Sequence, residues 1–191
     1  MISLVQTMVP LGAWFGAMFV IVAAPRLGKR KCFFIANGIL CVGSALSLVP
    51  NIPTICVGRF LYGIGAMGMM AALVPKTIEE TAPTRLKGSF GTMSQSNLNM
   101  GVLVAYSLFY IQPDTEEELA EGNQWQIVFM VPILFATVQT FVLLFVMPYD
   151  SLKFMKDKGM TKEYEYLVGR IYQDKEAALI YLAESSKIKT T

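Results

Sequence analysis

The chain has 191 residues, of which 54% are hydrophobic and only 16% are charged, and its mean hydropathy is +0.49. Soluble domains carry about 25% charged residues, so this composition argues against a soluble globular protein. The net charge of +2 favours no particular partner, and it indicates no nucleic-acid binding.

The residues that most often carry catalysis or hold metals are scarce. The chain has no histidine, which is the commonest catalytic base and metal ligand. Its three cysteines, Cys32, Cys41 and Cys56, are isolated within apolar stretches and are typical of packing residues rather than of a disulfide framework. We therefore expect no enzymatic activity, no cofactor and no metal site.

Long uncharged runs recur along the first 149 residues. A bilayer core about 30 Å thick requires roughly 20 apolar residues in helical form, so these runs predict about five membrane-spanning helices. The predicted spans are residues 2–24, 32–49, 54–75, 88–110 and 125–147. The sequence thus predicts an all-α membrane bundle over residues 1–149, followed by a linker over 150–191.

Charge is distributed unevenly among the predicted loops. The loop 25–31 carries four bases and no acid, whereas the loop 111–124 carries five acids and no base. Short loops rich in Lys and Arg stay on the cytoplasmic side. We therefore expect the 25–31 and 76–87 loops and the tail from Asp150 to be cytoplasmic, and the acidic loop to be outside. This alternation puts Met1 outside with no leader before it, so we expect Met1 to be an internal residue of a longer protein.

The third span contains an arginine, Arg59, among apolar residues. A charge inside a membrane is costly unless it reaches the interface or faces a polar cavity, and the sequence leaves both possibilities open. The glycines that follow, Gly63, Gly65 and Gly68, match the dinucleotide-binding pattern GxGxxG. They lie within one uninterrupted apolar helix with no preceding strand, so we interpret them as helix-packing residues.

The fourth span is unusually polar in its first half. Gln95 and Asn99 are four residues apart and therefore share a helix face. Amide groups in a membrane must face protein or water, so this face is a candidate lining for a passage that binds a polar, uncharged solute. We include the neighbouring Leu98 in the predicted solute contacts. The alternative is that the amides bond neighbouring helices together.

The tail mixes both charge signs. Residues 161–172 and 174–184 have the spacing of short amphipathic helices, which we expect at the cytoplasmic face.

Four motifs together resemble the N-terminal half of a sugar porter of the major facilitator superfamily, the glucose-transporter type. GAWFGAMFVIVAAPRLGKRK resembles the signature between that family's second and third helices, with Pro25 replacing its acid or amide. GRFLYGIG and PKTIEETAPTRLKG resemble the signature of its fourth and fifth helices, with Lys87 for an arginine. PYDSLKF resembles more weakly the motif after its sixth helix. The fourth motif is the fifth-helix glutamine that binds sugar hydroxyls, at the position of Gln95.

The resemblance implies an incomplete bundle, from the family's second helix into its central loop, that lacks the first helix and the second half. It implies sugar binding by Gln95 and Asn99, a position for Arg59 near the outer entrance, and a further polypeptide or segment that completes the bundle. Charged residues at the cytoplasmic helix ends are expected to form a gating network. Its predicted members are Arg26, Lys29, Arg30, Glu79, Glu80, Lys87, Asp150 and Lys153.

The sequence is compatible with two functions. One is transport of a hexose-like solute across a membrane by alternating access, together with the missing part. The other is a non-transporting, transporter-derived structural subunit of a larger membrane complex.

Overall fold

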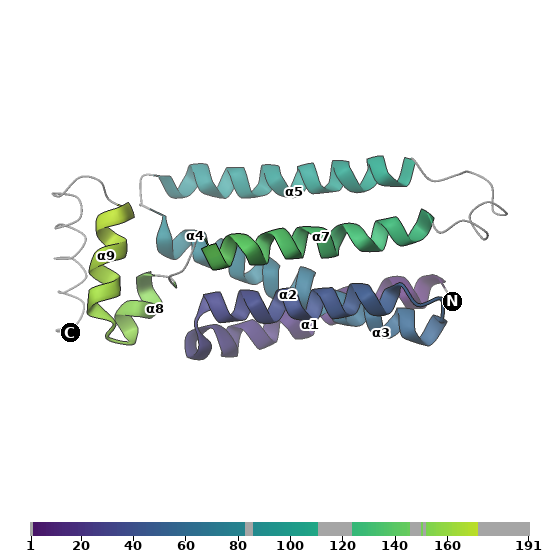
Figure 1. The fold of residues 1–191 in the computed structure, drawn as a ribbon, viewed down its shortest axis with the longest axis horizontal. Helices are drawn as coiled ribbons and strands as arrows, with labels where there is room; N and C mark the ends of the chain where they lie inside the picture. The colour runs from purple at the N-terminus through teal and green to yellow at the C-terminus, as the bar shows by residue number, and fades with distance from the viewer. Residues whose placement is uncertain (1, 83–85, 111–123, 146–149, 151, 172–191) are drawn as a thin grey trace.

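The computed structural model describes residues 2–82, 86–110, 124–145, 150 and 152–171. The secondary-structure elements over these residues are helices (Figure 1). They are α1 (Ile2–Leu27), α2 (Lys29–Ser47), α3 (Ile52–Tyr62), η1 (Gly63–Met70), α4 (Ala71–Thr81), α5 (Lys87–Tyr110), α7 (Gln124–Phe145), α8 (Leu152–Asp157) and α9 (Thr161–Ile171).

The long helices run side by side along the molecule, and α8 and α9 lie beyond one end of them (Figure 1). At the end near α8 are the α1–α2 turn, the end of α4, the start of α5 and the end of α7. We call this the α8 end. Helix α5 lies on the outside of the bundle, and α7 lies between it and the group formed by α1, α2 and α3.

The turn between α1 and α2 is a single residue, Gly28, whose φ of 89° is in the left-handed region that favours glycine. The sequence predicted a polar loop over 25–31, but Pro25 and Arg26 complete α1, and Lys29 begins α2. A connection of one residue requires the end of α1 and the start of α2 to lie next to each other. The side chains of the predicted basic loop therefore project from two helix ends.

The third long helix is continuous from Ile52 to Thr81 and comprises α3, η1 and α4. It begins after Asn51, which is extended, and has a proline in its first turn, where a missing N–H costs nothing. The sequence predicted that this span ends at Pro75 and that a charged loop follows over 76–87. Instead Pro75 lies inside the helix, so Lys76, Glu79 and Glu80 occupy its last turns.

Within this helix η1 is π-helical: its backbone hydrogen bonds join residues five apart instead of four. Three buried glycines in η1 bring its backbone against α1 and α2. A Cβ at Gly65 would stand 2.7 Å from the carbonyl oxygen of Ala36, and one at Gly68 would stand 2.5 Å from that of Ala13. These glycines therefore pack helices, as the sequence predicted.

The apolar core lies where α1, α2 and the third long helix meet, and Leu143 of α7 packs against it. Its fully buried side chains include Val20, Cys32, Met69 and Leu73. By contrast, most apolar side chains of α5 and α7 are exposed. Exposed apolar surface of this extent is normal for a helix that faces lipid or other membrane helices.

Three described helices are long and apolar enough to cross a membrane: Val5–Leu27, Ile52–Glu80 and Gln126–Phe145. Helix α2 begins with three consecutive bases, and α5 is rich in polar residues in its first half. Neither helix is therefore apolar enough in composition to be counted with these three. The acidic loop over 111–123 and the second amphipathic helix expected over 174–184 lie outside the described residues. The first, expected over 161–172, corresponds to α9.

Candidate functional site

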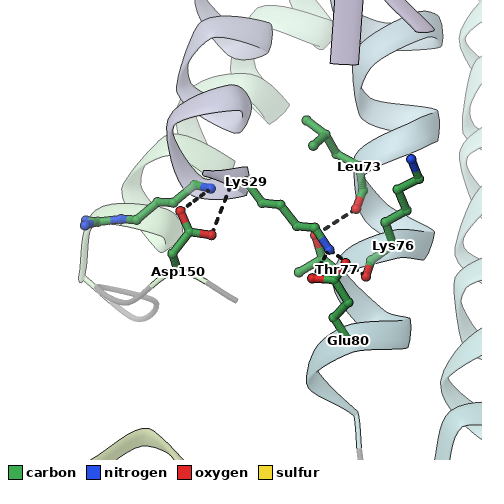
Figure 2. Close-up of polar contacts among 7 residues, drawn as sticks. Lys29, Leu73, Lys76, Thr77, Glu80 and Asp150 are labelled. Carbon is green, nitrogen blue, oxygen red and sulfur yellow. Dashed lines mark hydrogen bonds and ion pairs between the residues drawn. The ribbon is translucent and has the colours of Figure 1, made fainter. Parts of the chain in front are cut away.

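A network of charged groups joins three segments at the α8 end of the bundle. The ammonium group of Lys29 lies 2.6 Å from Oε2 of Glu80 and donates a hydrogen bond of 2.8 Å to the carbonyl oxygen of Lys76. Only 8% of the Lys29 side chain and 24% of the Glu80 side chain are exposed. Figure 2 shows Lys29 extending to α4, where both of these partners lie.

Asp150 contacts the same residue from the other side (Figure 2). Its carboxylate accepts hydrogen bonds from the backbone N–H groups of Lys29 at 3.0 Å and Arg30 at 3.2 Å. These N–H groups belong to the first turn of α2, which Gly28 leaves without a capping side chain. A carboxylate is also favoured there by the helix dipole. Asp150 thus replaces a local cap and attaches the chain after α7 to the start of α2.

The predicted gating residues divide into two groups in the structure. Lys29, Glu80 and Asp150 are brought together, and Arg30 joins them through its backbone N–H while its guanidinium donates to the carbonyl oxygen of Leu143 at 3.5 Å. Arg26 and Glu79 are exposed. The side chains of Lys87 and Lys153 lie outside what the structure describes.

A cavity of about 530 Å³ lies between α2, α3, α5 and α7. Most of its lining is apolar, but six of the lining residues have polar side chains. They are Ser44, Ser47, Arg59, Tyr62, Asn97 and Gln139. Sequence reasoning found only Arg59 among them.

Arg59 lines this cavity. Its guanidinium carbon lies 4.5 Å from the centroid of the Phe129 ring on α7, which is within the range of a cation–π interaction. The sequence left open whether this arginine extends to the interface or faces a polar cavity, and the structure has it at the cavity.

Gln95, Leu98 and Asn99 are exposed on α5 and are not among the residues that line the cavity. The cavity side of α5 instead carries Asn97 and Gly101. At about 100° per residue, Asn97 is turned by roughly 200° from both predicted amides, so it lies on nearly the opposite face of the helix. The spacing of Asn97 and Gly101, four residues apart, is the signal that could have identified this second face.

The described residues contain no group of three or more His, Cys, Asp or Glu side chains that could hold a metal ion. The polar groups that the two regions contain are amides, hydroxyls, guanidinium groups, the Lys29 ammonium group and carboxylates.

The fold is that of the major facilitator superfamily, and the predicted all-helical membrane fold is confirmed. The bundle superposes on the proton:xylose symporter XylE bound to 6-bromo-6-deoxy-D-glucose with a TM-score of 0.84 and 19% identity, over 95% of this chain and 42% of that chain. An inward-open structure of the xylose transporter XylE from E. coli gives a TM-score of 0.80 and 20% identity, over 94% and 44% of the two chains.

The profile of the family described as "Sugar (and other) transporter" matches residues 1–188, and the chain belongs to this family. It is 34% identical over 110 residues to the "Probable metabolite transport protein CsbC" of Bacillus subtilis, which covers 57% of this chain and 24% of that protein. It is 28% identical over 176 residues to "Sugar transporter ERD6-like 9" of Arabidopsis thaliana, covering 90% of this chain and 49% of the relative.

The chain thus spans about half or less of these relatives. The resemblance to a sugar porter predicted from the sequence is confirmed, and the chain is an integral membrane protein. The relatives are transporters and not enzymes.

Proposed function

We propose that this chain forms part of a carrier that moves a hexose-like solute across a membrane by alternating access, together with a further polypeptide segment that completes the bundle. Its membership of the sugar (and other) transporter family supports this class of solute. In this proposal residues 1–149 cross the membrane five times, and residues 150–191 are a cytoplasmic linker.

One observation carries the proposal: the amides of Gln95 and Asn99 are exposed on a face of α5 that the described part of the chain leaves uncovered. An amide offers both hydrogen-bond donors and acceptors, which matches the two roles of a sugar hydroxyl. A polar face in the middle of a membrane helix requires water, solute or another helix as its partner. In a completed carrier this face would line the solute passage, with Leu98 as an apolar contact.

The charged network at the α8 end would act as the gate on the cytoplasmic side. Lys29, Glu80 and Asp150 come from α2, from α4 and from the segment before α8, so their contacts depend on how these segments are arranged. Rocking of one part of a carrier against the other can break and re-form such contacts. We assign the acidic loop 111–124 to the outer side by the same topology.

The test is uptake of labelled hexose by the chain reconstituted in vesicles, with and without any protein that co-purifies with it. We expect uptake in the presence of the partner, and we expect Gln95→Ala and Asn99→Ala each to reduce it strongly. The matched control is Asn97→Ala, which removes the same amide from the opposite face of α5.

A larger loss with Asn97→Ala than with Gln95→Ala would show that the solute uses the α5–α7 cavity instead. Absence of uptake in every preparation, with the chain held in a stable membrane complex, would favour the structural-subunit function.

A further inference from the structure

The π-helical segment η1 stands between the two functional regions of the third long helix. On one side of it, α3 carries Arg59 into the cavity. On the other side, α4 carries Lys76 and Glu80 to Lys29. Any change in η1 therefore turns the Lys29-binding end of this helix relative to the cavity end.

A π-helical segment contains one residue more than the α-helical segment that would leave the following helix in the same position. Such segments are frequent at functional sites. If the backbone hydrogen bonds of η1 change from the π-helical to the α-helical pattern, η1 no longer accommodates its extra residue, and α4 is displaced along the helix by one residue. The helix beyond η1 then turns by about 100° and advances by about 1.5 Å, the increments of one α-helical residue. Each residue of α4 moves into the place that its successor held.

The residues of α4 are suited to this one-residue exchange. Glu79, which is exposed, precedes Glu80 and would take its place beside Lys29. The carbonyl oxygen of Pro75 would replace that of Lys76 as the second acceptor for the same ammonium group. Lys29 thus keeps a carboxylate and a carbonyl in both registers.

Packing of the apolar core determines which of the two registers is more stable. Leu73 is completely buried, and in the α-helical register Ala72 would occupy its position. The smaller side chain fills less of the core, so the π-helical register is the resting one and the α-helical register is the minor one. In the α-helical register Met67 would also move into the place of Gly68, where a Cβ lies 2.5 Å from the carbonyl oxygen of Ala13, so packing against α1 disfavours this register as well.

We propose that η1 is a register switch that exchanges Glu80 for Glu79 as the partner of Lys29. The switch has two discrete states because Lys29 is buried and is paired with one of two adjacent carboxylates. It does not depend on which solute, if any, the protein transports, so its test does not measure transport.

The first experiment uses a bifunctional thiol reagent whose length matches the distance between two introduced cysteine side chains. It is applied to the reconstituted chain with Cys32, Cys41 and Cys56 replaced by alanine. Two cysteine pairs are compared: Lys29→Cys with Glu80→Cys, which reports the resting register, and Lys29→Cys with Glu79→Cys, which reports the alternative one. We expect the first pair to cross-link strongly and the second pair to cross-link measurably. Absence of the second cross-link would overturn the proposal.

Deletion of Met67 separates a register switch from simple flexibility of α4. Met67 is 58% exposed within η1, and its removal converts η1 to an α-helix while every residue of α4 keeps its resting place. We expect the deletion variant to fold, to retain the Lys29–Glu80 cross-link and to lose the Lys29–Glu79 cross-link to background. The matched control is deletion of Val57, which is 54% exposed in α3 and should disrupt folding because no extra residue lies there to absorb the loss.

A second measurement leaves Lys29 intact and follows thermal unfolding of Glu80→Gln with and without Glu79→Gln. If Glu79 can replace Glu80, adding Glu79→Gln lowers the melting temperature further in the intact chain than in the Met67 deletion variant. An equal effect of Glu79→Gln in both backgrounds, or failure of the Met67 deletion variant to fold, would refute the switch.

Discussion

Replacement of Asp150 by alanine tests whether this carboxylate caps α2 from a distant part of the chain. Asp150→Ala removes the acceptor of two backbone hydrogen bonds, from Lys29 at 3.0 Å and from Arg30 at 3.2 Å. Loss of an N-terminal helix cap costs about 0.5–2 kcal/mol. Hydrogen bonds to a charged acceptor are worth about 1.5–3 kcal/mol each, so the loss belongs at the upper end of the capping range.

We therefore expect Asp150→Ala to lower the free energy of unfolding by about 2 kcal/mol, from the capping range and the charged acceptor together. For a chain of this size such a loss corresponds to a fall in melting temperature of about 4–8 °C. Asp150→Asn retains one side-chain oxygen as an acceptor and should cost about half as much, because the charge is lost but one bond remains.

The assay is thermal unfolding of the purified chain in detergent, monitored by circular dichroism, at one protein and detergent concentration for all variants. The matched control is Asp157→Ala, which removes an exposed carboxylate from α8 and should change the free energy of unfolding by less than about 0.5 kcal/mol. If Asp150→Ala melts at the same temperature as Asp157→Ala, the capping argument is wrong.

Two further predictions concern helix packing. Gly68→Ala puts a methyl group 2.5 Å from the carbonyl oxygen of Ala13, so α1 and η1 must separate, and we expect a loss of about 1–3 kcal/mol in chemical unfolding. Gly38→Ala is its control, since no atom of the described residues lies within 4 Å of the added methyl group and the free energy of unfolding should rise slightly. Equal effects of the two substitutions would contradict the close packing. Phe129→Leu removes the ring beneath Arg59 and should lower stability by about 0.5–2 kcal/mol, measured by the same unfolding, whereas Phe135→Leu, at a side chain that lines the same cavity but is 62% exposed, should not. A Phe129→Leu variant as stable as Phe135→Leu would show that the cation–π contact contributes nothing.

The class of protein and the residue types available for its function could be predicted from the amino-acid sequence alone. Long uncharged runs require helices that satisfy their own backbone hydrogen bonds, which is a local property of the chain. The residues Lys29, Glu80 and Asp150 were predicted from motifs that resemble those of the sugar porters, because the types and order of motif residues are visible without any structure.

Which of these residues contact one another depends on how the folded helices are arranged. Helical periodicity predicts that Gln95 and Asn99 share a face, but it does not say which neighbour that face meets, and the cavity is lined by Asn97 instead. Charge alone did not distinguish Glu79 from Glu80 as the partner of Lys29. That choice depends on the π-helical segment η1, whose one extra residue sets the rotation of α4, and on Gly28, which lets Asp150 approach the start of α2. Contacts between segments distant in sequence depend on the packing of whole helices, and this is why the local pattern could not predict them.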